Sequence, residues 1–172
     1  MSVERSNRRY GAAQMRRIAR GLLEASTLCA ISTVSSRGRP HVHTAYFAWD
    51  ADLRLVWLSD PGARHSRNLH AAAAAAVAVY DSTQRWGHPD RGIQLFGDAT
   101  EAVGRLGDEA ERVYAARFPG FRPEELAGLR LYVFRPHRIK LFDEPALGSG
   151  VFVTARVRAR GRLTWDRTQI YR

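Results

Sequence analysis

The alternation of hydrophobic and polar residues predicts a chain of short strands with three helices between or beside them. From Ala12 to Ala25 the apolar residues recur every three or four positions, the spacing of one buried helix face, and arginines occupy the other face. A second amphipathic pattern covers residues 106–118. A third helix is expected after Pro61, running into six consecutive alanines, because alanine is the best helix former.

The remaining apolar segments are short and bounded by turn residues, as strands are. Gly97 is expected to mark a bulge or bend in its strand, and Pro136 a bend or edge between two strands. Hairpin connections dominate, so the sheet should be mostly antiparallel and closed or nearly closed, within a single α+β domain that is mainly β with flanking helices. The predicted strands cover residues 27–34, 41–49, 53–59, 76–81, 91–103, 129–136, 138–142 and 150–157.

Composition places the chain among ordinary globular domains. Its 172 residues are 45% hydrophobic, which argues against disorder, and no run of about 18 apolar residues could span a membrane. The arginine-rich N-terminus has no apolar segment after it and is not a secretory signal, so we expect a cytoplasmic protein without membrane contact. The single cysteine, Cys29, lies in an apolar run and is expected to be a buried, unreactive thiol.

The net charge of +10 is concentrated at the two ends of the chain. Residues 1–20 and 156–172 each carry six arginines against one acidic residue, while the stretch between them has equal numbers of basic and acidic residues. We therefore expect basic and flexible ends over residues 1–10 and 158–172. Charge in the ends, rather than in a groove of the body, predicts no specific nucleic-acid partner.

Positive charge also gathers at the start of the helix expected after Pro61. Asp60 is a suitable N-cap and Pro61 a suitable first helical residue, which places Arg64, His65 and Arg67 in the first two turns. Cations are unfavourable beside the positive end of a helix unless an anion compensates, and phosphate is the usual anion there. A solvated helix end is the alternative interpretation.

His41 and His43 alternate along one predicted strand and therefore face the same side. Such a pair could bind a metal ion, but the sequence places no third ligand beside it, and no metal site is predicted. Both histidines are candidates for proton transfer, although strand histidines without such a role are commoner. No catalytic residue is assigned.

Residues 27–103 resemble the pyridoxamine 5′-phosphate oxidase-like superfamily of FMN-binding split barrels. The resemblance is carried by GRPHVHTAYFAWD, LVWLSDPGARHSRNL, AVAVYD and RGIQLFGDAT. It implies an antiparallel split β-barrel that forms a homodimer with FMN at the interface. An abundance of aromatic residues agrees with a buried dimer face; these are Tyr46, Phe47, Trp49 and Trp57.

The resemblance also implies the cofactor-binding residues. The family holds the FMN phosphate with a threonine, an arginine and a lysine, whose positions here hold Ser59 (after Leu58), Arg64 and His65. The strand beside the flavin ring begins at Val42 and continues through His43, Thr44 and Ala45. Gln94 would form a hydrogen bond to the ring, and Trp86 and Arg91 would line the substrate side.

Several positions depart from the family pattern. His65 replaces the lysine of the phosphate site, Phe47 replaces a second lysine, and Gly92 replaces a glutamine, with Gln94 two positions later. These departures argue against the pyridoxal-forming activity more than against cofactor binding. We therefore predict an FMN-dependent oxidoreductase acting on a small molecule. The alternatives are a deazaflavin-dependent reductase of the same fold and a non-enzymatic flavin- or haem-binding protein.

Overall fold

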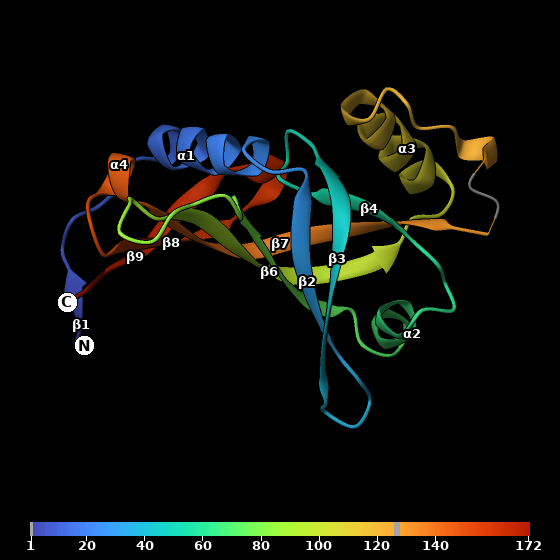
Figure 1. Ribbon diagram of the computed structural model, residues 1–172, viewed down its shortest axis with the longest axis horizontal. Coiled ribbons are helices and arrows are strands. Elements are labelled where there is room, and N and C mark those ends of the chain that lie inside the picture. Colours follow the sequence, from blue (N-terminus) through green and yellow to red (C-terminus); the bar gives the residue numbers. More distant parts are fainter. Residues whose placement is uncertain (1, 126–127) are drawn as a thin grey trace.

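The computed structural model describes residues 2–125 and 128–172, which form one antiparallel sheet with helices packed around it (Figure 1). The strands are β1 (Val3–Ser6), β2 (Leu28–Val34), β3 (Pro40–Trp49), β4 (Leu55–Ser59), β5 (Ala74–Tyr80), β6 (Arg91–Glu101), β7 (Arg130–Asp143), β8 (Val151–Val157) and β9 (Leu163–Tyr171). The helices are α1 (Ala12–Glu24), α2 (Arg64–Ala71), α3 (Arg105–Arg117) and the short α4 (Glu144–Leu147), with 3-10 turns at Pro123–Glu125 and Ala159–Gly161.

Six of the strands close into a barrel. Their order is β7-β4-β3-β2-β5-β6, and pairing of β6 with β7 completes the ring, while β8, β9 and β1 extend the sheet from β7. The predicted mainly antiparallel split barrel is thus confirmed. Side chains from all six barrel strands fill the interior, where the large residues Trp57, Tyr132, Phe47 and Phe134 are fully buried.

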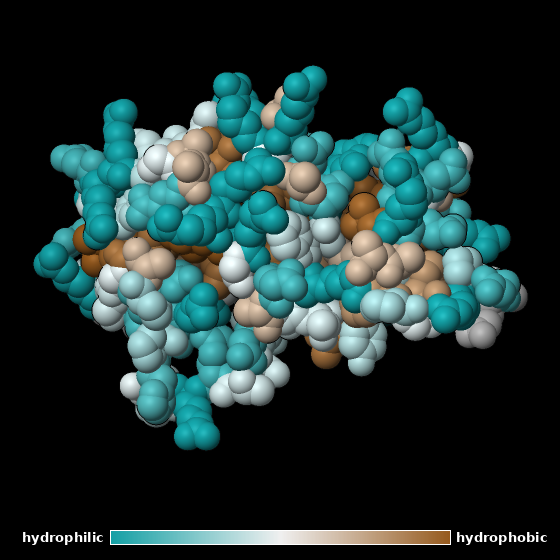
Figure 2. Space-filling model, turned by 90° about the horizontal axis from the view of Figure 1, so that it is seen from above, coloured by the Kyte–Doolittle hydropathy of each residue, from teal (hydrophilic) through white to brown (hydrophobic). Residues whose placement is uncertain are grey.

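The helices cover separate parts of the barrel. α1 packs its apolar face on the sheet through Met15, Ile18 and Leu22, as its spacing predicts. α3 forms a second, smaller apolar cluster with β3, β4 and β7. Seen from the side of α1 and α3, the surface is mostly hydrophilic, with hydrophobic residues exposed in small areas (Figure 2). None of the helices in the described ranges is long and apolar enough to cross a bilayer.

The alanine run corrects the sequence prediction. The helix ends at Ala71, and β5, which was expected from Ala76, already begins at Ala74 and pairs with β2 and β6. Helix propensity amounts to under about 1 kcal/mol per residue, so hydrogen bonding to strands on both sides outweighs it.

The expected break at Pro136 is also different in the structure. Residues 130–143 form one continuous strand, and Pro136 lies opposite Gly97, where the register of β6 and β7 shifts. Phe96 pairs with Arg138 and Gly97 with Pro136, so the extra residue is His137, and the bulge lies in β7, opposite Gly97, rather than in the strand of Gly97 as expected. A Cβ atom on Gly97 would lie 2.0 Å from the Arg135 carbonyl oxygen, so this close approach of two backbones requires glycine.

The two basic ends of the chain meet instead of extending as separate flexible segments. β1 pairs with β9, and backbone hydrogen bonds join Ser2 to Arg172 in both directions, at 2.8 and 3.1 Å. Figure 1 shows the two termini side by side at one end of the sheet. The pairing follows from the backbone groups of β9, which would otherwise be an open sheet edge.

Candidate cofactor site at the start of α2

The segment before α2 forms a turn rather than a helical cap. Asp60 accepts a hydrogen bond from the Gly62 N–H at 2.7 Å through its carboxylate, and its carbonyl accepts one from the Ala63 N–H at 3.0 Å. The helix begins at Arg64, after Ala63, and no side chain caps it. The expected cap at Asp60 and first turn at Pro61 were wrong, so Arg64 and His65 lie nearer to the free backbone N–H groups of the helix than predicted.

Arginines from two elements line a pocket at this helix start. The turn between β2 and β3 contributes Arg37 and Arg39, and α2 contributes Arg64 and Arg67, around a cavity of about 310 Å³. The other lining residues carry no carboxylate; they are Ser35, Ser36, Pro40, His41 and Asn68. We call this cavity the arginine pocket. Four guanidinium groups without a lining acid make it suited to an anion.

Ser59 and His65 lie beside the arginine pocket but form contacts with each other. Ser59 Oγ and His65 Nε2 are hydrogen-bonded, and Ser66 Oγ lies 3.2 Å from Ser59 Oγ. Ser59 is buried at the end of β4, and neither residue lines the pocket. Of the three predicted phosphate ligands, Arg64 therefore lines the pocket, whereas Ser59 and His65 form a hydrogen bond with each other.

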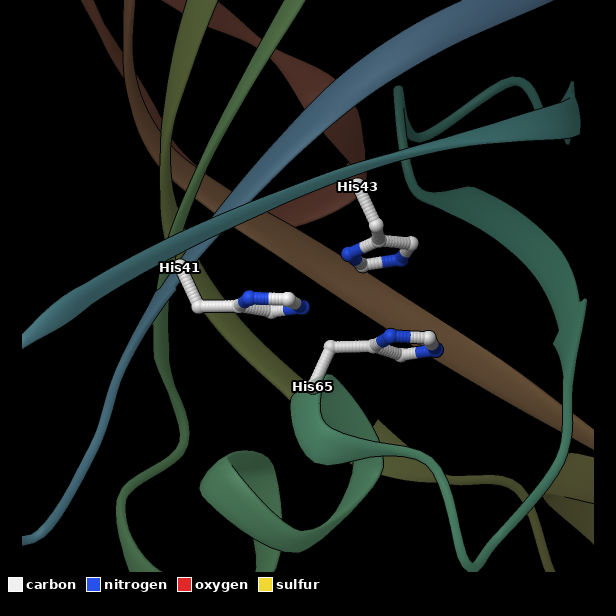
Figure 3. Close-up of side chains that lie close together, drawn as sticks. All are labelled: His41, His43 and His65. Carbon is white, nitrogen blue, oxygen red and sulfur yellow. The ribbon is translucent and has the colours of Figure 1, made fainter.

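His65 also completes a group of three histidines. His41 and His43 project from β3 toward His65 at the first turn of α2, and the three rings are nearly parallel (Figure 3). The ring centroids of His43 and His65 are 3.5 Å apart, and His41 lies 6.2 and 6.1 Å from them. We call these residues the histidine cluster. The sequence predicts the shared face of His41 and His43, but the position of His65 depends on how α2 packs against β3.

Two histidines of the cluster, His43 and His65, favour their neutral forms. Burial, followed by the neighbouring charges of His65 and His41, lowers the pKa of His43 to about 4, and burial also lowers the pKa of His65. Both ring nitrogens of His43 are buried and have no hydrogen-bond partner among the residues that the structure describes. Leaving a buried polar group unpaired costs about 1–3 kcal/mol. His65, being mostly neutral at neutral pH, does not supply the fixed charge of the family's lysine.

The residues predicted to lie beside the flavin ring divide between the two faces of β3. His43 and Ala45 are half-buried on the inner face, whereas Thr44 is exposed and Val42 is 61% exposed on the outer face. Val42 and Gln94 line one shallow groove of about 330 Å³ on this outer face. The rest of the groove is made by small or apolar residues and one serine; these are Ala30, Ser32, Ala76, Val77, Ala78 and Phe96.

Three other predicted residues lie away from this groove. Leu58 is half-buried against the α3 cluster, on the opposite side of β4 from Ser59. Arg91 forms an ion pair with Asp143 at 3.3 Å, and Trp86 is fully exposed in the loop between β5 and β6. Arg37 and Arg39 were not predicted, although a hairpin turn with two arginines next to a basic helix start could have indicated them.

The model of the pyridoxamine 5′-phosphate oxidase family matches residues 15–143 of the chain. The chain belongs to this family. The match spans the whole barrel, from α1 to the end of β7, and so includes both the arginine pocket and the outer groove. Among curated proteins, none matches the chain.

The names of similar solved structures mention three different cofactors, which are FMN, heme and F420. A pyridoxamine 5′-phosphate oxidase-related, FMN-binding protein from Nostoc punctiforme is 14% identical, with a TM-score of 0.58, and the match covers 90% of this chain and 93% of that one. A heme storage protein from Vibrio cholerae is 18% identical (TM-score 0.58; 68% and 86% covered). An F420 reductase is 24% identical (TM-score 0.53; 69% and 93% covered). At these identities the similarity shows the shared fold.

Proposed function

We propose that this member of the pyridoxamine 5′-phosphate oxidase family binds FMN and acts as an oxidoreductase on a small molecule. The observation that carries the proposal is the arginine pocket, where Arg37, Arg39, Arg64 and Arg67 surround a cavity without a lining carboxylate. Arg64 is the first residue of an uncapped helix, so its guanidinium and the free N–H groups can bind one phosphate together.

The outer groove fits the flat, largely apolar ring of the same cofactor. Pro40 and His41 line the arginine pocket and Val42 lines the groove, so both cavities border the start of β3, the pocket on the side of α2 and the groove on the outer face. Ala76 and Ala78 give the groove a floor of small side chains, and Gln94 offers an amide that can donate and accept hydrogen bonds. This arrangement supports the roles of Val42, Gln94 and Arg64 inferred from the family resemblance.

A second copy of the chain is the partner that we propose for the face around this groove. The outward side chains of β2, β3 and β5 carry no charge, and several large apolar residues on them are exposed: Leu28, Val34, Val42, Tyr46 and Tyr80. An exposed apolar face of this kind is typical of an interaction surface. Of the aromatic residues expected at the interface, Phe47 and Trp57 instead fill the barrel interior, and Tyr46 remains available.

When bound, FMN supplies the transfer of a hydride or of electrons. The chain would contribute binding and orientation: Arg64 and the pocket arginines neutralise the phosphate, Gln94 fixes the ring by hydrogen bonding, and the second subunit excludes water from the groove. Trp86, in the loop before β6, and Arg91, the first residue of β6, stay the candidates for contact with the substrate that the family resemblance implies.

The test compares two arginines that each begin a helix. Arg64→Ala removes a pocket arginine, whereas the control Arg105→Ala removes the exposed first residue of α3. Charge-assisted hydrogen bonds contribute about 1.5–3 kcal/mol each, so losing one or two should weaken FMN binding by about one to four decades. Arg105→Ala should leave it unchanged. Quenching of flavin fluorescence on titration with apoprotein measures both affinities.

Riboflavin, which lacks the phosphate, should bind far less tightly than FMN and should not respond to Arg64→Ala. Equal affinities for FMN and riboflavin would contradict the assignment of the arginine pocket to phosphate. The absorption spectrum of the protein as purified tests the cofactor itself, because flavin, deazaflavin and haem absorb at different wavelengths. A haem or deazaflavin spectrum would replace the FMN proposal with the corresponding alternative.

A further inference from the structure

We propose that His41, His43 and His65 form a binding site for a divalent transition-metal ion, with Zn²⁺ as the reference ion. The three side chains come from β3 and α2, two elements separated by β4 in the chain, and they converge on one place (Figure 3). This inference rests on the histidine cluster rather than on the four arginines of the pocket, and the two sites share only the lining residue His41.

The geometry allows one ion to reach all three rings. One nitrogen atom from each histidine lies within 4.8 Å of those of the other two. Zn–N bonds are about 2.0–2.1 Å long, so two imidazole nitrogens on a tetrahedral ion lie about 3.4 Å apart. The rings therefore need to close by about an ångström and also to turn out of their nearly parallel arrangement, because each nitrogen lone pair lies in the plane of its ring. Rotation about the side-chain bonds changes both the distance and the orientation.

The hydrogen bonding of the cluster differs from that of the chain's other histidines near carboxylates. His70 pairs with Glu101 at 3.3 Å and His137 with Asp98 at 2.7 Å. In the described ranges, no histidine of the cluster has such a partner, and both ring nitrogens of His43 are buried and unpaired. An ion in the cluster would give the buried lone pair of His43 its missing partner.

Ser59 suits the role of a positioning residue for the site. Metal-binding histidines usually donate their second ring N–H to a hydroxyl, carbonyl or carboxylate oxygen, which fixes the tautomer. With its proton on Nε2, His65 donates to Ser59 Oγ and leaves Nδ1 free for the ion. Ser59 itself is held by the neighbouring Ser66 hydroxyl, 3.2 Å away, so the pair has a defined orientation.

The donor set indicates the class of metal. Three imidazole nitrogens favour Zn²⁺, Co²⁺, Ni²⁺ or Cu²⁺ over Mg²⁺ and Ca²⁺, which prefer oxygen ligands. Three protein ligands leave a fourth position of a tetrahedral ion for water or an anion. His41 also lines the arginine pocket, so an anion drawn there by the arginines is close to the cluster and can offset the charge of the ion.

The experiment uses the full chain, treated with a chelator, and measures Zn²⁺ binding by calorimetry and bound metal by elemental analysis. We expect one Zn²⁺ per chain. Co²⁺ should give the intense visible bands of a tetrahedral site. His43→Gln and His65→Gln should each weaken Zn²⁺ binding by about 10–100-fold or more. That range is the usual effect of losing a residue that only hydrogen-bonds to a metal ligand, and loss of a ligand itself should cost at least as much. His41→Gln, at the more open end of the cluster, provides a variant that perturbs folding least.

His70→Gln and His137→Gln are matched controls, because each removes a histidine that already has a carboxylate partner. They should bind Zn²⁺ as the unchanged chain does. Ser59→Ala should weaken binding less than loss of a ligand and should change the Co²⁺ spectrum. Absence of stoichiometric Zn²⁺ binding in the unchanged chain, or equal binding by folded cluster variants and controls, would overturn the proposal. FMN titrations of the same samples report separately on the flavin site.

Discussion

Burial makes the Cys29 thiol much less reactive than an exposed thiol. Its side chain is 2% exposed on β2, and burial raises the pKa of its thiol to about 12. At pH 9 about one thiol in a thousand would then be ionised in the folded chain, against about half for a model thiol of pKa 9.0. Because the thiolate is the reactive form, we expect iodoacetamide to modify Cys29 at least about a hundredfold more slowly in the folded chain than in urea.

Mass spectrometry of samples quenched over time at pH 9 measures the two rates. A mixture with free glutathione in the same tube serves as the control for reagent activity under each condition. Similar rates for folded and unfolded chain would show that the thiol is accessible, and would contradict the buried position of β2 in the barrel wall.

At the scale of elements, Arg117 joins three parts of the fold. It is the last residue of α3, and its Nη2 donates to the carbonyl oxygens of Leu23 at 3.2 Å and Ser26 at 2.8 Å, at the end of α1. The guanidinium also lies 4.8 Å from the centre of the Phe47 ring on β3. A cation is favourable at a helix C-terminus, where carbonyl groups lack partners.

Arg117→Met should therefore lower the free energy of unfolding by about 2–4 kcal/mol, because hydrogen bonds to a charged group contribute about 1.5–3 kcal/mol and two carbonyl groups lose their donor. Arg112→Met, on an exposed turn of the same helix, should change it by less than about 0.5 kcal/mol. Urea denaturation of both variants measures the difference. An equal, small effect of the two substitutions would show that Arg117 does not fix the end of α1.

For the whole molecule, the uncharged outer face predicts assembly. The chain has a mass of 19.3 kDa, and light scattering at micromolar concentration should give twice that value. Val42→Asp places a charge in the middle of the face and should shift the protein toward monomer, because an unpaired buried charge is strongly unfavourable at an interface. Val42 is 61% exposed, so the change should leave the fold of each chain intact.

Val103→Asp is the control, because Val103 is similarly exposed, at 68%, in the segment before α3 and away from the uncharged face. It should leave the mass unchanged. A monomeric wild-type chain would contradict both the dimer and the proposed closure of the flavin groove by a second subunit.

The sequence by itself determined the elements whose residues carry a strong local pattern. Most strands from β2 to β8 were predicted within a few residues, because alternating apolar side chains and turn residues leave little choice of face or boundary. The amphipathic helices α1 and α3 were predicted for the same reason. The short strand β1 was not, since its pairing with β9 joins two chain ends that are distant in sequence. The strand β9, which pairs with the preceding β8, was not predicted because its many polar residues obscure the alternation.

The alanine run shows where local pattern fails. Ala71 to Ala76 have one composition but divide between the end of α2 and the start of β5. The helix propensity of alanine favours a helix over all six residues. Residues from Ala74 onward form a strand only because their backbone groups form hydrogen bonds with the strands on either side of β5. The same holds for Pro136, which interrupts nothing because Gly97 opposite allows the bulge.

Part of the candidate site was likewise readable from the residues. Arg64 was predicted from its place at a helix start, and the shared face of His41 and His43 from strand alternation. The tertiary structure alone decided that the β2–β3 turn adds Arg37 and Arg39 to the pocket, and that His65 meets His43 and Ser59. These contacts between separate elements follow from how α2 packs on the barrel. Neither the hydrophobic periodicity nor the composition of the chain specifies that packing.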